Sequence, residues 1–335
     1  MKGIFFTCIS ILVATLLIPL LIITSCHMEA PQRKDSHKIE EIRESDFKIN
    51  VYNHETKEIM EMYLEEYISQ VVAAEVPASF ELEALKSQAV AARTFTLWRI
   101  MSLGKEGHPS HPSAPVCTSH THCQECLSMD EIKERHGKVW MSMYWPKIQE
   151  AVTETAGIIM TYNMDPIEPL YHSTSGGKTE NSEDVFASAL PYLRSVSSPY
   201  EERSPALIDE KEISIKEFIK GLKGKEKDFQ IKEKDMKGEI KIIERNTGGS
   251  IKNIKIGNKN FTGSEIRSIF QLRSADFTVD IGKNTITFVT RGYGHGVGMS
   301  QWGANGMAEK GKDYEEILKH YYQGITLSKL ASHRK

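Results

Sequence analysis

One carboxylate stands out because it occupies a helical position where the pattern predicts an apolar residue. Leu64, Ile68 and Val71 recur at helical spacing, and Glu75 follows on nearly the same face. Pro77 predicts that this helix ends at about Glu75, near the negative end of the helix dipole. Apolar neighbours and that dipole both raise the pKa of a carboxyl group, which suits a general acid working near neutral pH. The alternative is a Glu75 side chain that turns to solvent at a frayed helix end.

A second helix is predicted between Ser79, which we expect to be its N-cap, and Gly104, which should end it. Arg93 is a lone cation beside two alanines in the middle of this helix. It has two interpretations: an arginine that reaches the surface along its aliphatic stem, or a fixed charge that faces the same cleft as Glu75. The predicted buried stripe of the helix consists of Leu82, Leu85, Ala89, Ala92, Thr96 and Ile100.

The two helices carry a recognisable signature. The run E-V-P-A-S-F-E-L-E-A-L-K-S-Q-A-V-A-A-R-T-F, residues 75–95, closely resembles that of the stage II sporulation protein D family. Members of this family are lytic transglycosylases that cut peptidoglycan glycan strands during engulfment of the forespore. The resemblance extends from about residue 49 to about residue 325. It implies that Glu75, the Glu of the E-x-P step, is the catalytic acid.

Two further segments are rich in glycine and polar residues. H-S-T-S-G-G, residues 172–177, ends a predicted strand at 167–173, and G-Y-G-H-G-V-G-M-S-Q-W-G-A, residues 292–304, follows a predicted strand at 285–290. Alternating glycines allow a close approach of another strand or of a sugar ring. The spacing fails G-x-G-x-x-G and no Walker A sequence is present, so dinucleotide and phosphate sites are excluded.

Taken singly, each Ser or Thr of the first segment is better explained by an ordinary turn. Both segments nevertheless match the family, in which they help to build the catalytic groove. The resemblance therefore implies a set of residues that hold substrate or stabilise charge in the groove. These are Arg93, Tyr171, His172, Ser173, Thr174, Ser175, Lys178, Tyr293, His295 and Gln301.

A loop rich in Pro and Ser follows the second helix and contains clustered Cys and His. His111, Cys117, His122 and Cys123 have the spacing H-x5-C-x4-H-C, a ligand set suited to tetrahedral Zn²⁺. Other ligand sets would use His108, His120 or Cys126, and outside the cytoplasm a disulfide with one odd thiol competes. The first set matches the pattern by which some family members bind zinc, so we expect zinc. Four ligands leave no open position, which predicts a structural ion.

The N-terminus predicts a membrane anchor. The uncharged apolar run from Ile4 to Ser25 is long enough to span a bilayer, and Lys2 before it places the remaining chain outside the cytoplasm. The competing interpretation is a cleaved lipoprotein signal that ends at Cys26. We therefore expect an anchor at 1–26, a polar tether at 27–47, and a peptidoglycan-cleaving ectodomain at 48–330 with a zinc-binding loop at 105–129.

The 335 residues and an apolar share of 40% permit a large core, and the net charge of -3 gives no general attraction to nucleic acid. We expect a mixed α/β (α+β) ectodomain with two lobes around a long groove. The expected function is a lytic transglycosylase that needs one acid and forms a 1,6-anhydro product. Hydrolysis remains open because Glu180, Glu183 and Asp184 lie near the H-S-T-S-G-G segment.

The resemblance also implies a setting for the protein. It places the chain in the mother-cell membrane facing the forespore septum, acting on glycan stripped of stem peptides. It further implies partnership with the stage II sporulation protein P amidase and with a membrane-embedded engulfment partner. Two other classes remain: a non-catalytic wall-binding scaffold that recruits an amidase, and a zinc peptidase or amidase, against which the missing H-E-x-x-H motif counts.

Overall fold

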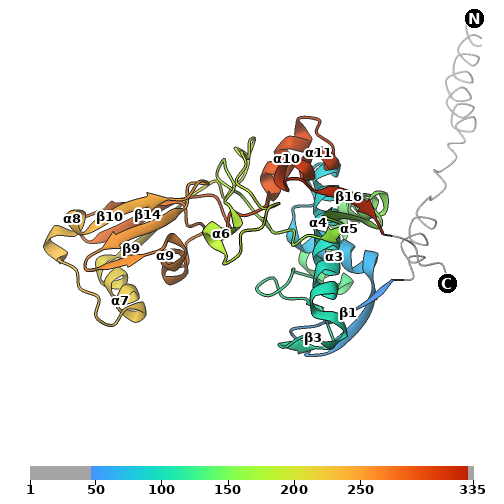
Figure 1. The fold of residues 1–335 in the computed structure, drawn as a ribbon, viewed down its shortest axis with the longest axis horizontal. Coiled ribbons are helices and arrows are strands. Elements are labelled where there is room, and N and C mark those ends of the chain that lie inside the picture. The colour runs from blue at the N-terminus through green and yellow to red at the C-terminus, as the bar shows by residue number, and fades with distance from the viewer. Residues whose placement is uncertain (1–46, 331–335) are drawn as a thin grey trace, which may run out of the picture. The chain divides into compact units, whose positions relative to one another are not determined.

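The computed structural model describes residues 47–330 (Figure 1). The predicted anchor lies outside these residues, and so does the predicted tether apart from Phe47. Within the described range, no helix has both the length and the apolar character needed to cross a membrane.

The N-terminal part combines a small sheet with three packed helices. Two antiparallel strands form a hairpin with Asn53 in its turn, and the order of the sheet is β2-β1-β5. The three helices pack against one another (Figure 1) and bury Ile68, Val71 and Leu85 in a first core. The elements are β1 (Lys48–Tyr52), β2 (Ile59–Tyr63), α3 (Leu64–Glu75), α4 (Leu82–Leu103), β3 (Gly107–His108), β4 (His111–Pro112), β5 (Val116–Cys117) and α5 (Met129–Glu154).

One detail of this part corrects the sequence analysis. Ser79 is not the N-cap of the second helix, because α4 begins at Leu82 with Glu81 as its N-cap. The backbone N–H of Phe80 donates to the carbonyl of Pro77, so the intervening residues form a turn instead. The end of α4 at Gly104 is as predicted.

A second core joins segments that are distant in the sequence. β8 pairs in parallel with β15, and β6 lies between β16 and β7 in a three-stranded sheet. Met160, Leu193, Met299 and Ile317 are buried in this core. Its elements are β6 (Ile158–Tyr162), β7 (Asp165–Pro166), β8 (Tyr171–His172), α6 (Ser182–Val185), β15 (Met299–Ser300), α10 (Gln301–Glu309), α11 (Tyr314–Tyr321) and β16 (Thr326–Lys329).

The third core is formed within one continuous segment of the chain. Two three-stranded sheets, ordered β13-β14-β9 and β10-β11-β12, bury residues such as Phe218, Ile254 and Phe288. Ile208 at the start of β9 pairs with Arg291 at the end of β14. The elements are β9 (Ile208–Ser214), α7 (Ile215–Lys225), α8 (Met236–Glu239), β10 (Ile240–Arg245), β11 (Ile251–Ile256), β12 (Lys259–Phe261), α9 (Gly263–Phe270), β13 (Phe277–Ile281) and β14 (Thr285–Arg291).

The described chain is therefore a mixed α/β structure with several small sheets, as the sequence predicts. The predicted arrangement in two lobes stays a prediction.

Candidate active site

A groove of about 720 Å³ brings together residues from seven separate parts of the chain. This volume is in the range of ligand-binding pockets. The parts are the end of α3, Phe95 of α4, the loop that follows β5, the segment 169–173 that contains β8, Pro205, the helix α9, and the glycine-rich segment together with the start of α10. The side chains that matter below are Glu75, Gln124, Glu125, Tyr171, His172, Ser173, Arg267, Tyr293, His295, Gln301 and Trp302.

Glu75 is the last residue of α3, and the next residue, Val76, already has extended backbone angles. One carboxylate oxygen, Oε1, accepts a hydrogen bond of 2.6 Å from the backbone N–H of Glu125. Burial raises the pKa of Glu75 to about 7, and the negative charge of Glu125 adds to this effect, while the hydrogen bond from the Glu125 N–H and the nearby Tyr171 hydroxyl oppose it. A carboxyl group with this pKa can donate a proton at neutral pH and take one back as carboxylate.

The strand β8 places Tyr171 and His172 in the groove, and Ser173 follows directly after the strand and lines the groove as well. The Tyr171 hydroxyl donates to Oε1 of Gln124 at 3.0 Å. His172 Nδ1 lies 3.1 Å from the carbonyl oxygen of Val297, which makes Nδ1 the protonated nitrogen. His172 Nε2 is then a buried acceptor, and it has no hydrogen-bond partner in the described part of the chain.

His295 completes a pair of uncharged imidazoles, with its ring centroid 5.6 Å from that of His172. Burial lowers the pKa of His172 to about 4, and burial together with the neighbouring His172 lowers the pKa of His295 to about 3. Both rings are therefore neutral at physiological pH. Nδ1 of His295 accepts a hydrogen bond of 3.1 Å from the Val297 N–H, so Nε2 of His295 carries the proton. The pair therefore combines one acceptor, His172 Nε2, with one donor, His295 Nε2, and both suit the hydroxyl groups of a sugar.

The alternating glycines allow a close approach of two backbone segments, which was the first of the two expectations. A Cβ on Gly298 would lie 2.0 Å from the carbonyl oxygen of Leu170, and one on Gly294 would lie 2.7 Å from Cβ of His172. Gly294 also has a φ of +120°, which side-chain-bearing residues rarely adopt. These glycines therefore hold the segment that carries His295 against the strand that carries His172.

A buried carboxylate, Glu201, ties the two glycine-rich segments together. Its oxygens accept hydrogen bonds from the backbone N–H groups of Ser175, Gly176 and Gly177 at 3.1, 2.8 and 3.2 Å. They also accept from the Ser175 hydroxyl at 2.9 Å and from the hydroxyl of Ser300, the N-cap of α10. The buried carboxylate of Glu201 is tolerated because both of its oxygens are hydrogen-bonded.

Three residues predicted for the groove lie behind its wall or away from it. Thr174 is buried and its hydroxyl lies 2.7 Å from that of Ser204. Ser175 is buried against Glu201, and Lys178 is exposed and does not line the groove. The H-S-T-S-G-G segment therefore contributes its first residues to the groove and its last residues to the support behind it.

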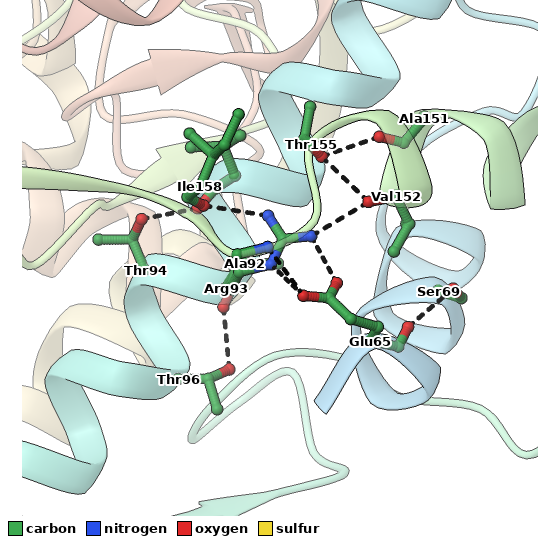
Figure 2. A network of polar contacts seen from close by, with 12 residues as sticks. Glu65, Ser69, Ala92, Arg93, Thr94, Thr96, Ala151, Val152, Thr155 and Ile158 are labelled. Carbon is green, nitrogen blue, oxygen red and sulfur yellow. Dashed lines mark hydrogen bonds and ion pairs between the residues drawn. The ribbon is translucent and has the colours of Figure 1, made fainter. Parts of the chain in front are cut away.

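Arg93 does not line the groove, which corrects the expectation for this residue. Its side chain is 0% exposed and forms two hydrogen bonds with the Glu65 carboxylate, of 2.8 Å from Nε and 2.6 Å from Nη2 (Figure 2). Arg93 Nη1 also donates to the carbonyl of Ile158 at 3.1 Å. The N–H of Gly157 donates to the same carboxylate at 3.2 Å. Arg93 thus links α3, α4 and the start of β6 inside the molecule.

The three acidic residues that kept hydrolysis open are also engaged elsewhere. Glu180 is buried and accepts hydrogen bonds from the backbone N–H groups of Gly248 and Ser250 at 2.9 and 2.8 Å. Glu183 pairs with Arg194, and Asp184 accepts from the Asn181 amide at 2.9 Å. The second carboxylate that does line the groove is Glu125, which forms an ion pair of 3.0 Å with Arg135.

Sequence reasoning missed three polar groove residues: Gln124, Glu125 and Arg267. The first two belong to the loop between the predicted zinc ligands and α5, where no helical or strand pattern indicates which way a side chain points. Arg267 belongs to a short helix far along the chain, in a stretch where the sequence analysis proposes no site residue. A capping box between Thr262 and Glu265 was the available signal, and it fixes the start of α9 but not which side chain faces a groove.

The four predicted metal ligands do come together. One ligand atom from each of His111, Cys117, His122 and Cys123 lies within 4.8 Å of all the others. The three described cysteines, Cys117, Cys123 and Cys126, are free thiols, so the described chain contains no disulfide among them. Cys126 is buried in the first core and is not part of the cluster.

The chemistry of this cluster fits a zinc ion. Nδ1 of His111 lies 2.7 Å from the carbonyl of Ala114, which fixes its proton there and leaves Nε2 free as a ligand. A hydrogen bond from the Cys123 thiol lowers the pKa of Cys117 to about 5 and raises the pKa of Cys123. Thiolate sulfur and imidazole nitrogen are the donor types that Zn²⁺ prefers. These residues would hold the ion and thereby order the loop that carries Gln124 and Glu125.

Comparisons with known proteins agree with the resemblance. The family model for stage II sporulation protein matches residues 52–162. Stage II sporulation protein D of Bacillus amyloliquefaciens is 38% identical over 349 aligned residues, covering 99% of this chain and 97% of that protein. The chain belongs to the stage II sporulation protein D family.

Other relatives support this assignment. Stage II sporulation protein D of Bacillus subtilis strain 168 is 39% identical over 289 residues, covering 86% of this chain and 81% of that protein. A protein of the same organism named amidase enhancer is 29% identical over 307 residues, which is 77% of this chain and 40% of that protein. Family membership makes this a sporulation protein.

Proposed function

We propose that the protein is a lytic transglycosylase that cuts peptidoglycan between N-acetylmuramic acid and N-acetylglucosamine. The observation that carries this proposal is Glu75, a carboxyl group with a pKa of about 7 in an open groove. Glu75 protonates the glycosidic oxygen. As carboxylate it then accepts the proton of the 6-hydroxyl of N-acetylmuramic acid, which closes on C1 and gives a 1,6-anhydro sugar. Neutral His172 and His295 and the ring of Tyr293 contact the glycan.

The proposal includes the setting that the resemblance implies. The protein is anchored in the mother-cell membrane, faces the forespore septum and acts there during engulfment on strands without stem peptides. Its partners are the stage II sporulation protein P amidase and a membrane-embedded engulfment protein. Zn²⁺, held by His111, Cys117, His122 and Cys123, has a structural role, because four protein ligands leave no position for a reacting water.

The decisive experiment identifies the ends of the products by mass spectrometry. Wild-type protein, Glu75→Gln and Glu125→Gln are each incubated with glycan strands stripped of peptides. We expect anhydro ends from wild type and from Glu125→Gln, and a loss of at least about 100-fold in Glu75→Gln, because a general acid contributes about that factor. Equal rates of glycan cleavage by wild type and Glu75→Gln would disprove the mechanism.

The Glu125 variant separates two reaction types. If wild type forms reducing ends and Glu125→Gln forms none, the reaction is hydrolysis with Glu125 as the base that activates water. The ion pair of Glu125 with Arg135 favours a bystander role, because it holds the carboxylate away from a reacting water.

A second candidate is a wall-binding scaffold that stimulates an amidase and does no chemistry. The observation in its favour is the relative named amidase enhancer. This candidate predicts that the wild-type protein and Glu75→Gln bind glycan and increase amidase turnover equally, without any cut in the glycan strand.

A further inference from the structure

Arg267 is a groove cation with no carboxylate partner of its own. It lines the groove from α9, and no carboxylate among the side chains that the structure describes forms an ion pair with it. Its Nε donates to the carbonyl of Leu272 at 3.3 Å, while its two Nη atoms have no hydrogen-bond acceptor in the described chain. A guanidinium presents its donors as a planar fork that matches a carboxylate. Arg267 therefore has the geometry of a binding group for an anion.

The surrounding helix holds this side chain in place. The capping box of Thr262 and Glu265 fixes the first turn of α9, and Ile266 and Phe270 on the same helix are buried in the third core. The hydrogen bond to Leu272 anchors the guanidinium at the end of the helix. The two groove carboxylates do not satisfy it, because Glu125 is paired with Arg135 and Glu75 accepts from the Glu125 N–H.

We infer that Arg267 binds a carboxylate of the substrate, and that this group is the lactyl carboxylate of N-acetylmuramic acid. The inference rests on the proposed function, since the group belongs to the glycan. In a strand that carries stem peptides the lactyl carboxyl is an amide and has no charge. In a stripped strand it is free and negative. A site built for a charged group rejects the analogue that lacks it, so Arg267 selects stripped strands.

Binding experiments on the full-length protein with Glu75→Gln as the parent test this inference without turnover. One ligand is a stripped strand with free lactyl carboxylates, and the other is the same strand after conversion of the carboxylates to methylamides. We expect the parent to bind the free strand about 10-fold more tightly, as for a hydrogen bond between charged groups. Adding Arg267→Gln should remove this preference by weakening only the free strand, and Arg267→Lys should retain part of it.

Arg203→Gln is the matched control. Arg203 is exposed, pairs with Glu309 at 2.6 Å and does not line the groove, so its variant should keep the full preference. A preference that persists in Arg267→Gln would overturn the role of Arg267 and leave the proposed function standing. Equal binding of both strands by the parent, or an equal loss for both strands in Arg267→Gln, would also overturn it. Failure of the parent to bind any glycan would instead overturn the proposed function, and this inference with it.

Discussion

At the scale of single residues, two carboxylates beside the same groove have opposite surroundings. The Glu201 carboxylate accepts hydrogen bonds from three backbone N–H groups and from the hydroxyls of Ser175, Ser198 and Ser300. No lone pair of Glu201 is left for a substrate proton. Glu75 has one backbone donor, a raised pKa and access to the groove. Glu75 can therefore exchange a proton with a ligand, whereas Glu201 has a structural role and stabilises the segments behind the groove.

The raised pKa of Glu75 predicts how stability depends on pH. The folded protein binds a proton at Glu75 up to pH of about 7, whereas the unfolded chain releases it near 4.5. This contribution to stability is complete below pH 4.5 and is lost as the pH rises to about 7. We expect Glu75→Gln to be more stable than wild type at pH 8, on the order of 2 kcal/mol, and the difference to vanish at pH 4.

Denaturant unfolding at both pH values measures this difference. Glu202→Gln is a suitable control, because Glu202 is exposed and the same change there should have little effect at either pH. A wild-type protein that is as stable as Glu75→Gln at pH 8 would show that Glu75 ionises normally.

The residues of the site differ in how far the sequence predicts them. Glu75 is predictable because the helical period marks its place and Pro77 marks the helix end. Arg93 is not, because its partner Glu65 lies 28 residues earlier on another helix, and a sequence pattern cannot show that two faces meet. The helices α3 and α4 follow from periodicity and stop signals. The close packing of β8 on the segment 292–298 cannot be predicted in this way, because it depends on contacts between residues that are more than 100 positions apart in the sequence.

At the scale of elements, the loop between β5 and α5 carries candidate metal ligands and also contacts Glu75. One part of the loop contributes to the metal-ligand cluster. Another part donates a hydrogen bond to Glu75 from the Glu125 N–H and accepts one from the Tyr171 hydroxyl at Gln124. The loop contains no helix or strand of its own between Cys117 and Met129. A bound ion would therefore fix the surroundings of the acid.

Elemental analysis tests the metal and its ligands. We expect zinc in an equimolar amount in wild type and in Cys126→Ser, and almost none in Cys117→Ser. Both changes remove one buried thiol, so Cys126→Ser controls for packing. Chelation should lower the unfolding temperature and slow glycan cleavage together, as expected for a structural ion.

Two results would contradict this prediction. Zinc retained in Cys117→Ser would mean another ligand set, with His108, His120 or Cys126. Cleavage lost on chelation with an unchanged unfolding temperature would indicate a catalytic metal and favour the zinc hydrolase alternative.

At the scale of the whole molecule, the Arg93–Glu65 pair connects the helices of the first core to the start of β6 (Figure 2). Removing one partner leaves a buried charge unpaired. We expect Arg93→Met to destabilise the protein by about 3–5 kcal/mol, and the double variant with Glu65→Leu to recover at least about 1 kcal/mol of this loss. Thermal and denaturant unfolding measure both effects.

Glycan binding separates this role from a role in the groove. Measured well below the unfolding temperature, the folded fraction of Arg93→Met should bind glycan as wild type does. Weaker glycan binding by Arg93→Met, without a change in its unfolding temperature, would mean that Arg93 contacts the substrate in the groove.

The pairing of Ile208 with Arg291 has a consequence for how such a protein can evolve. The segment 208–291 has a core of its own, and its two ends are neighbours, which is the arrangement of a domain inserted into another. Such an insertion can change in length or sequence while Glu75 and its loop stay as they are. The insertion carries Arg267, so under the two proposals above the choice of substrate and the acid chemistry would be encoded in separate parts of the chain. Relatives with the same acid could then acquire different glycan preferences by exchanging this insertion.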